Sequence, residues 1–301
     1  MKTLKLIQSD SYLRPYASAI EGRYNYAVYQ EKKLTGGQKL SDWANGFMYF
    51  GLHHTDGQWI FREWAPNATA IYIIGDFNSW KKSENYRLQP VGNGVWEAIL
   101  PDQAMQHEQL YKLLVEWQGG WGERIPSYAT RVVQDENTKL FSAQVWAPKE
   151  EKVEKLKIKG AKRRKASDPL FIYECHVGMS SEEEKVNSYD EFRRDILPRI
   201  AKLGYNCLQI MAIQEHPYYG SFGYHVSNFF AVSSRCGTPE ELKHLIADAH
   251  AYGMDVIMDI VHSHAVKNEL EGLGNFDGTP YQYFHDGARR EHPAWDSLCF
   301  N

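Results

Sequence analysis

An apolar run that ends in polar side chains is the first place in this sequence where chemistry could occur. Residues 254–261 are mostly apolar, and Asp259, His262, Ser263 and His264 gather at the end of the run. Such a run predicts a strand buried on both faces, as in parallel sheets. Because α/β barrels carry out their chemistry at the carboxyl ends of their strands, we expect these side chains to lie at a site.

Aromatic side chains are expected to lie beside these polar groups. Tyr218, Tyr219, Phe222 and Tyr224 are interleaved with glycines in the long segment 214–237, and we name these four rings the aromatic lip. Aromatic faces can stack on flat ligands, including the C–H faces of sugar rings. The alternative is that the loop packs back on the fold, and we expect this for at least two of the four rings.

The region that carries both features alternates between predicted strands and helices. This order indicates a parallel sheet with helices outside it. Thr238 and Glu241 form a predicted capping box at the start of one helix, which ends at Gly253. Pro198 predicts a kink in the other helix. The predicted strands are residues 170–175, 206–213 and 254–261.

Two further regions precede this alternation. Residues 9–33 have apolar side chains at helical spacing, with Pro15 near the start. From Phe47 the period becomes two, and short runs punctuated by Gly, Pro, Asn and Asp predict a β-sandwich of about a hundred residues. The predicted strands are residues 47–52, 59–64, 70–74, 94–100, 109–116, 131–133 and 139–146.

The boundaries of these regions follow from changes in composition. Residues 149–168 are rich in Lys and Arg and predict a solvated linker, with a basic patch for an anionic partner as the alternative. We therefore expect a multidomain chain. It has a helical segment at 1–44, an all-β sandwich at 45–148, the linker, and an α/β region at 169–301.

Bulk composition limits the class of protein. The chain has 301 residues, 43% of them hydrophobic, which is enough for sizeable cores. A net charge of −4 gives no electrostatic case for nucleic acid as the main partner. The four cysteines form no C-x-x-C pair, and no segment has the length and apolar character of a membrane span. We expect a cytoplasmic protein that binds no membrane.

Three stretches in the α/β region together resemble a known family. They are Glu-His-Pro-Tyr-Tyr-Gly-Ser-Phe-Gly-Tyr-His-Val-Ser-Asn-Phe-Phe-Ala at 215–231, Ser-Arg-Cys-Gly-Thr-Pro-Glu-Glu-Leu at 234–242, and Asp-Ile-Val-His-Ser-His-Ala at 259–265. The chain resembles the 1,4-α-glucan (glycogen) branching enzymes of the α-amylase superfamily, in the branch that includes the eukaryotic enzymes. Shorter stretches agree in the same order, at 12–16, 63–66, 75–80, 172–178, 281–284 and 295–297.

The resemblance implies a fold and a reaction. The fold is an amino-terminal helical segment, a carbohydrate-binding β-sandwich and a (β/α)₈ TIM barrel, of which this chain holds about the first three strands. The reaction cleaves an α-1,4 bond in a glucan such as glycogen and rejoins the segment as an α-1,6 branch. It retains configuration through a glycosyl-enzyme on one carboxylate, with a second carboxyl as acid and then base. No cofactor or metal is implied, and the complete enzyme is expected to be a monomer.

The resemblance also assigns roles to residues of the α/β region. Tyr224 matches the aromatic residue that stacks on sugar at the cleavage site. Asp259 and His264 match the first signature region, where a neutral imidazole hydrogen-bonds sugar hydroxyls and the Asp organises its neighbours. His262, Ser263, His264 and Ala265 are expected to line the donor groove.

The sandwich holds a second group of expected glucan-binding residues. Trp64, Pro66 and Trp80 fall in stretches that match its glucan-binding surface, and Trp96 is a weaker candidate. Core packing is the alternative for each tryptophan. It is as good an explanation as sugar binding for Trp96 and a poorer one for Trp80.

One departure from the family is large. The Phe-Arg-Phe-Asp-Gly sequence that carries the nucleophile is absent, and no Asp or Glu in this chain matches either catalytic carboxyl. We therefore expect an amino-terminal portion of a longer enzyme that is inactive alone. We also expect its incomplete sheet to have open edges, while the sandwich folds independently.

Two other functions remain open. His262 and His264 could belong to a metal-dependent hydrolase, although barrels of that kind usually carry such a pair on the first strand. The chain could also be a non-catalytic α-glucan-binding protein.

Overall fold

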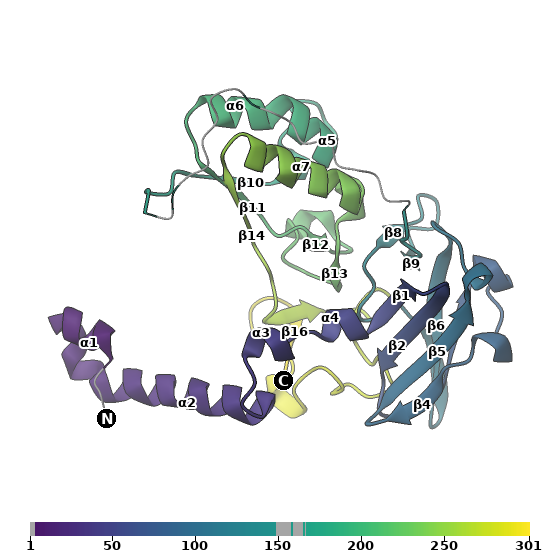
Figure 1. Cartoon of the computed structure of the whole chain (residues 1–301). Coiled ribbons are helices and arrows are strands. Elements are labelled where there is room, and N and C mark those ends of the chain that lie inside the picture. Colours follow the sequence, from purple (N-terminus) through teal and green to yellow (C-terminus); the bar gives the residue numbers. More distant parts are fainter. Residues whose placement is uncertain (1–3, 149–157, 159–164, 166) are drawn as a thin grey trace. The chain divides into compact units, whose positions relative to one another are not determined.

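The computed structural model describes residues 4–148, 158, 165 and 167–301 (Figure 1). The predicted linker at 149–168 therefore lies almost entirely outside the described residues. The chain forms two compact units, Met1–Tyr49 and Phe50–Asn301, which are described separately below.

The first unit is helical. Its main helix confirms the prediction for residues 9–33, and Pro15 lies in the 3₁₀ turn just before it. Gly36 ends this helix in the left-handed conformation, at φ +63°. The predicted strand at 47–52 is wrong in its first half, because the chain is helical there. The elements are α1 (Lys5–Ser9), η1 (Ser11–Tyr16), α2 (Ala17–Thr35), α3 (Leu40–Trp43) and α4 (Gly46–Tyr49).

Two antiparallel sheets form the predicted sandwich in the second unit. One has the strand order β1-β2-β5-β4, and the other has the order β3-β6-β9-β8 with β7 on the side of β6. The strands are β1 (Gly51–Thr55), β2 (Gln58–Trp64), β3 (Ala68–Gly75), β4 (Gln89–Gly92), β5 (Val95–Pro101), β6 (Leu110–Trp117), β7 (Gly120–Arg124), β8 (Val132–Gln134) and β9 (Phe141–Gln144). Short 3₁₀ turns lie between them at η2 (Asp76–Asn78), η3 (Glu84–Tyr86) and η4 (Asp102–Ala104).

Two strands of the sandwich were not predicted. β4 contains Pro90 and Gly92, and β7 contains Gly120 and Gly122, so neither sequence favours a strand. Each forms because a neighbouring strand offers it a ladder of hydrogen bonds. β4 pairs with β5, and β7 pairs with β6 from Leu113 to Trp117.

Side chains from the α/β region help to fill the core of the sandwich. Its cluster of buried side chains includes Phe61, Ile71 and Leu113 from β2, β3 and β6, together with Phe276 and Phe284 from the α/β region. Both phenylalanines are at most 1% exposed. The expectation that burial in the sandwich is independent of the α/β region is therefore wrong, because a later segment of the chain completes the same core.

The α/β region contains the predicted three-stranded parallel sheet, in the order β10-β11-β14. Its strands are β10 (Ile172–Cys175), β11 (Cys207–Ile210) and β14 (Asp255–Met258). The helical elements are η5 (Val177–Met179), α5 (Tyr189–Glu191), η6 (Phe192–Ile196), α6 (Leu197–Lys202) and α7 (Pro239–Ala251). The helices α5, α6 and α7 lie together over this sheet (Figure 1).

The predicted capping box is confirmed. Thr238 Oγ1 accepts a hydrogen bond from the Glu241 amide at 3.2 Å, and Glu241 Oε2 accepts one from the Thr238 amide at 2.7 Å. Near Pro198 the helix changes type, since η6 is a π-helical turn followed by α-helical α6. Proline cannot donate the hydrogen bond of a regular turn, which accounts for the irregularity just before it.

The helices cover one face of the parallel sheet. On that face Cys175, Leu208 and Ile210 pack against Leu242 and Leu245 of α7 in a second buried cluster. Three apolar side chains at or after the end of β14 nevertheless remain exposed, namely Ile257, Met258 and Ile260. The prediction of a strand buried on both faces is therefore wrong for β14, whose four residues are half-buried or exposed.

Two small antiparallel pairs frame the segment expected to form the site. β12 (Gln214–Glu215) pairs with β13 (Asn228–Val232), and the aromatic lip connects them. β15 (His264–Val266) pairs with β16 (Ser297–Cys299). The remaining turns are η7 (Tyr219–Ser221), η8 (Ser234–Cys236) and η9 (Gly287–Arg289). Among the described residues, no helix has the length and apolar character needed to cross a membrane.

Candidate functional site

A cavity of about 450 Å³ lies where the aromatic lip meets β15. Two tyrosines of the lip, one buried histidine and one tryptophan supply its largest side chains. Its wall is mainly apolar, with polar groups at only a few points, as is typical of ligand sites. The lining residues are Tyr218, Gly220, Ser221, Tyr224, His225, His264 and Trp295.

Asp259 fixes the tyrosine at the centre of this wall. The Tyr224 hydroxyl donates to Asp259 Oδ2 at 3.1 Å, and Gln209 Nε2 donates to Asp259 Oδ1 at 2.9 Å. Burial, followed by the hydrogen bond to Asp259, raises the pKa of Tyr224. The carboxylate therefore holds a neutral tyrosine ring in place, which is the organising role that was expected of it.

His264 is held from two sides. Its Nε2 donates to the Tyr224 carbonyl at 3.1 Å, and its Nδ1 accepts from the Ser263 hydroxyl at 2.9 Å. Burial lowers the pKa of His264, and the nearby imidazoles of His225 and His292 lower it further. The lowered pKa favours the neutral imidazole that the resemblance implies at this position.

Trp295 is a wall residue that sequence reasoning did not single out. Its ring stacks on His292, with the centroids 4.2 Å apart and the planes at 5°, and it lies 5.1 Å from the His264 ring. Pairing of β16 with β15 brings this segment beside His264. The available signal was a tryptophan next to Asp296 and Ser297 in one of the resembling stretches.

The aromatic lip divides between the fold and the cavity. Tyr219 and Phe222 each have a ring centroid 5.8 Å from that of His176, although Phe222 is still 41% exposed, whereas Tyr218 and Tyr224 line the cavity. Gly223 lies between these groups at φ +87°, where a side chain would collide with a backbone carbonyl. Tyr219 packs back on the fold, as expected for at least two of the four rings, whereas Phe222 does so only in part.

The other residues expected at the groove lie elsewhere. Ala265 is fully buried in the sandwich core cluster, so its expected place in the groove wall is corrected to core packing. His262 is exposed, and its Nδ1 lies 3.2 Å from the Ile260 carbonyl. Ser263 does not line the cavity, and its hydroxyl donates to His264 Nδ1. Strand alternation explains why His264 and Ala265 separate, since neighbouring residues of β15 point to opposite faces.

The tryptophans of the sandwich differ in how far they are buried. Trp96 is 7% exposed, and its Nε1 donates to the Ala65 carbonyl, so its expected role in sugar binding is corrected to core packing. Trp64 is half-buried, with its ring edge-on to Tyr283. Pro66 and Trp80 are exposed. Trp121 is also exposed but was not predicted, because it lies between the glycines of β7.

His262 and His264 do not form a metal site. Both ring nitrogens of His264 are engaged within the chain, and His262 does not line the same cavity. Within the part of the chain that the structure describes, no group of three or more His, Cys, Asp or Glu side chains could hold a metal ion. The geometry therefore gives no support to the metal-dependent hydrolase.

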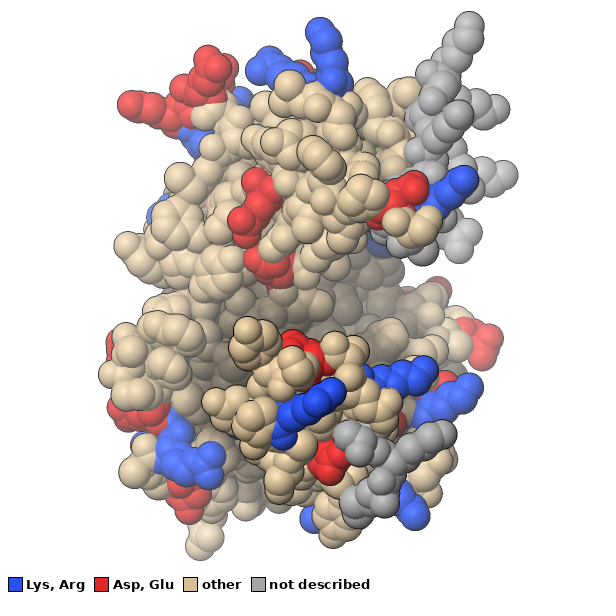
Figure 2. All heavy atoms as spheres, turned by 90° about the vertical axis from the view of Figure 1, so that its left-hand side faces the viewer, with Lys and Arg blue, Asp and Glu red and all other residues tan. Residues whose placement is uncertain are grey.

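Charge does not mark a binding face in the view of Figure 2. Lys and Arg are scattered there among Asp and Glu, with wide neutral areas between them. Neutral ligands rich in hydroxyl groups need no concentration of one charge. The cavity wall, rather than the charge pattern, therefore identifies the candidate site.

Two family profiles match separate parts of the chain. Residues 49–129 match carbohydrate-binding module 48, the isoamylase N-terminal domain, and residues 194–286 match the α-amylase catalytic domain. These matches confirm the predicted order of a sandwich followed by the first part of a catalytic barrel.

Curated relatives match almost the entire chain. It is 47% identical to the chloroplastic/amyloplastic 1,4-α-glucan-branching enzyme 2-2 of Arabidopsis thaliana, over 99% of this chain and 37% of that protein. It is 41% identical to the 1,4-α-glucan-branching enzyme of Dictyostelium discoideum, over 99% of this chain and 44% of that protein. The chain thus spans about two fifths of the length of these relatives.

Solved structures share the fold at low sequence identity. The catalytic module of the pneumococcal glycogen-degrading protein SpuA, in complex with an inhibitor, aligns with a TM-score of 0.65 at 17% identity, over 91% of this chain and 44% of that one. A putative α-amylase from Salmonella typhimurium gives 0.61 at 18% identity, over 83% and 38%. At such identities the likeness supports the fold alone.

Proposed function

Because the chain is homologous over nearly its whole length to 1,4-α-glucan-branching enzymes, we propose that it forms part of such an enzyme. In this proposal it supplies the carbohydrate-binding sandwich and the first strands of the catalytic barrel. The substrate is an α-1,4-glucan such as glycogen, and the product carries an α-1,6 branch. The observation that carries the proposal is the cavity in which Tyr224, His264 and Trp295 meet.

Each of these residues has a distinct task in the proposal. Tyr224 stacks on a glucosyl ring, and Asp259 keeps the tyrosine oriented through the hydrogen bond to its hydroxyl. His264 stays neutral and polarises a sugar hydroxyl when its hydrogen bonds rearrange around the substrate. Trp295 provides the opposite apolar wall. Together they bind and orient the donor chain, and they transfer no proton to or from the reacting bond.

The bond-breaking groups are proposed to lie outside residues 1–301. A retaining mechanism needs one carboxylate as nucleophile and one carboxyl as acid and base, about 5 Å apart. Asp259 does not fit either role in this proposal, because both of its oxygens accept hydrogen bonds from Tyr224 and Gln209. The greater length of the curated relatives supports this division.

A second candidate function has its own support. The exposed Trp80 and Pro66 could bind α-glucan without any catalysis, in which case residues 1–301 would act as a glucan-binding protein. Glucan binding without turnover is the expected behaviour of the isolated chain under both proposals. The two differ only in what a longer protein containing the whole barrel would do.

Iodine staining of amylose separates the two candidates. A protein that extends past Asn301 through the rest of the barrel should decrease the staining, while residues 1–301 alone should leave it unchanged. The Tyr224→Ala variant of the longer protein should work at a strongly reduced rate. Full staining after treatment with the longer protein would favour the non-catalytic function. Activity of 1–301 alone would show that the catalytic carboxyls are within it.

A further inference from the structure

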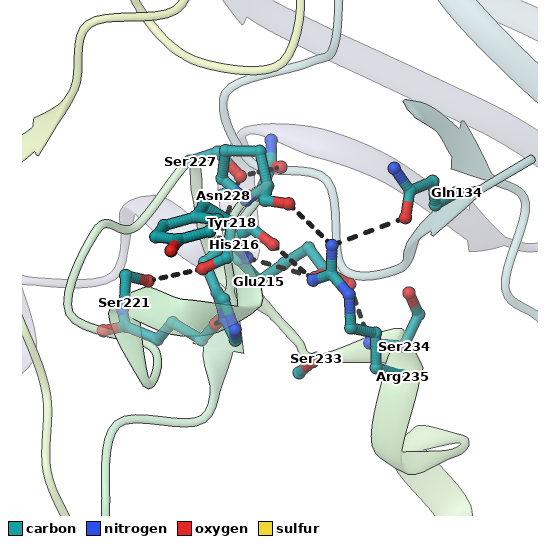
Figure 3. Close-up of polar contacts among 12 residues, drawn as sticks. Gln134, Glu215, His216, Tyr218, Ser221, Ser227, Asn228, Ser233, Ser234 and Arg235 are labelled. Carbon is teal, nitrogen blue, oxygen red and sulfur yellow. Dashed lines mark hydrogen bonds and ion pairs between the residues drawn. The ribbon is translucent and has the colours of Figure 1, made fainter. Parts of the chain in front are cut away.

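Arg235 lies between the sandwich and the aromatic lip. It belongs to the short turn η8, just before α7, and its side chain is 17% exposed. Figure 3 shows its guanidinium with Gln134 of β8 on one side and Glu215 and His216 at the base of the lip on the other. The sequence contains this arginine in one of the resembling stretches, but none of its neighbours in the sequence predicts these contacts.

On the lip side, both hydrogen bonds of Arg235 go to backbone carbonyls. Its Nη1 donates to the His216 carbonyl at 2.5 Å, and its Nη2 donates to the Pro217 carbonyl at 2.7 Å. These are consecutive carbonyls, and Tyr218 follows them directly. The planar fork of a guanidinium can hold two such acceptors at once in a fixed geometry, whereas an ammonium group is a single point of charge.

Arg235 also forms an ion pair with Glu215 beneath the lip. Glu215 is fully buried, and its Oε1 lies 3.6 Å from Arg235 Nη1. Its other oxygen accepts from the Ser234 amide at 2.7 Å, so the carboxylate binds the same turn that carries the arginine. Burial raises the pKa of Glu215, whereas these hydrogen bonds and Arg235 act in the opposite direction. Loss of the arginine would leave a buried carboxylate with less compensation.

On the sandwich side, Arg235 makes two weaker contacts. Its Nη2 donates to Gln134 Oε1 at 3.4 Å, and its guanidinium carbon lies 5.6 Å from the centre of the Phe141 ring. The sandwich has other attachments to the region around α7. Arg131 donates to the Gly237 carbonyl, and Trp146 donates to Glu240. Arg235 is therefore not needed merely to keep the sandwich attached.

We propose that Arg235 is a positioning residue that holds the 216–218 backbone against the sandwich and thereby places Tyr218 in the cavity wall. The sandwich then contributes to the shape of the donor site, in addition to any glucan that it binds itself. The placement of the loop follows from these contacts alone. Its consequence for glucan binding rests on the proposed function. Arg235 acts through Tyr218 and touches no reacting group.

The test compares Arg235→Lys with the unaltered protein in a chain that contains the complete barrel. Hydrogen exchange of peptides covering residues 216–222 should become at least about tenfold faster, because two charge-assisted hydrogen bonds to carbonyls are weakened. The KM for amylose should rise by roughly the same factor while kcat changes less than threefold, as expected when substrate binding is weakened and the chemistry is not. Gln134→Leu should shift both quantities in the same direction by a smaller factor.

Arg194→Lys is the matched control. Arg194 of η6 has a side chain that is 57% exposed, and its ion pair with Asp190 of α5 stays within these two consecutive helical turns. Its variant should leave the exchange of residues 216–222 and the KM unchanged. Thermal unfolding of all three variants measures any global loss of stability.

The hydrogen-exchange measurements test the role of Arg235 without the enzyme assay. Unchanged exchange at 216–222 in Arg235→Lys would overturn it. Faster exchange that is matched across the whole protein would also overturn it, because it would mean general destabilisation. Faster exchange confined to the lip supports the placement of the loop. If the unaltered protein neither binds nor branches amylose, the proposed function fails, and the exchange data still decide the role of Arg235.

Discussion

The sandwich and the parallel sheet solve the problem of burial in different ways. The two sheets of the sandwich face each other across one core, and the segment containing Phe276 and Phe284 completes it. The parallel sheet buries one face beneath its helices, while Ile257 at the end of β14 and Ile260 just after it remain exposed. Both regions have strands of similar apolar character. The apolar residues of a strand therefore indicate how much surface it could bury, whereas the elements that pack against the strand determine how much it does bury.

Substitution of Phe276 should have the largest effect. This ring is fully buried in the sandwich core although it belongs to the α/β region. We expect Phe276→Ala to lower the free energy of unfolding by about 3–5 kcal/mol, through lost burial and the cavity that remains. Urea denaturation followed by tryptophan fluorescence measures it. Leu203→Ala, at a side chain that is 71% exposed, should change stability by less than about 0.5 kcal/mol. Equal effects would mean that the two regions do not share a core.

A pH effect should come from the closed core rather than from the open sheet. Glu63 of β2 is fully buried, and burial raises its pKa to about 7 against the hydrogen bonds from Ser127 and Trp64. The folded state therefore binds the proton more tightly than the unfolded state. The contribution of Glu63 to stability is therefore greatest below about pH 4.5 and is lost as the pH rises through about 7, an effect on the order of 3 kcal/mol.

Glu63→Gln isolates this contribution. We expect the difference in unfolding free energy between this variant and the unaltered protein to change across pH 4.5–7 and to be constant above pH 8. Glu84→Gln is the control, because Glu84 lies on the surface of the same sandwich with its side chain 71% exposed. A difference that is independent of pH would show that the Glu63 carboxyl is ionised throughout this range.

Removal of one cavity ring should have an intermediate effect. Under the proposed function, Tyr224→Ala in a protein with the complete barrel should lower branching activity about fivefold or more, because stacking of one aromatic ring is worth on the order of 1 kcal/mol. It should also lower heat stability, since the Tyr224 hydroxyl no longer binds Asp259. Tyr224→Phe retains the ring and should recover most of the rate. An undiminished rate in Tyr224→Ala would remove this residue from the site.

The smallest effect on stability is expected at an exposed apolar side chain just after β14. Ile260 is 60% exposed, so Ile260→Gln should change the free energy of unfolding of residues 1–301 by less than about 0.5 kcal/mol. The substitution should instead reduce self-association, because exposed apolar patches and open strand edges favour it. Light scattering at increasing protein concentration measures the association. A large loss of stability would mean that this side chain is covered in solution.

Most of the element order could be predicted because it depends on local patterns. The capping box at Thr238 and the helical spacing before Gly36 act within a few residues, so the sequence alone defines them. β4 and β7 could not be found in this way. Their Gly and Pro residues argue against strands, and only pairing with β5 and β6 makes them strands.

The kinds of residue at the candidate site could be predicted from the sequence, but not which of them line the cavity. The motifs identified Tyr224, Asp259 and His264, and their hydrogen bonds bring these three together. Ala265 was assigned to the wrong surface, and Trp295 was overlooked as a wall of the cavity. The error on Ala265 concerns which side of β15 faces the cavity. The omission of Trp295 concerns which segment lies beside β15, and that depends on the pairing of β15 with β16.

The sequence by itself determined the periodicities, the helix ends and the motifs that relate this chain to the glucan-branching enzymes, because these are properties of neighbouring residues. Only the tertiary structure decided which face of each strand is inside. Trp96 lies opposite Glu63 in the β2–β5 ladder, and both are buried, whereas Trp64 lies on the other side of its strand. Alternation makes neighbours point in opposite directions, but the packing of a second layer selects which direction is the core.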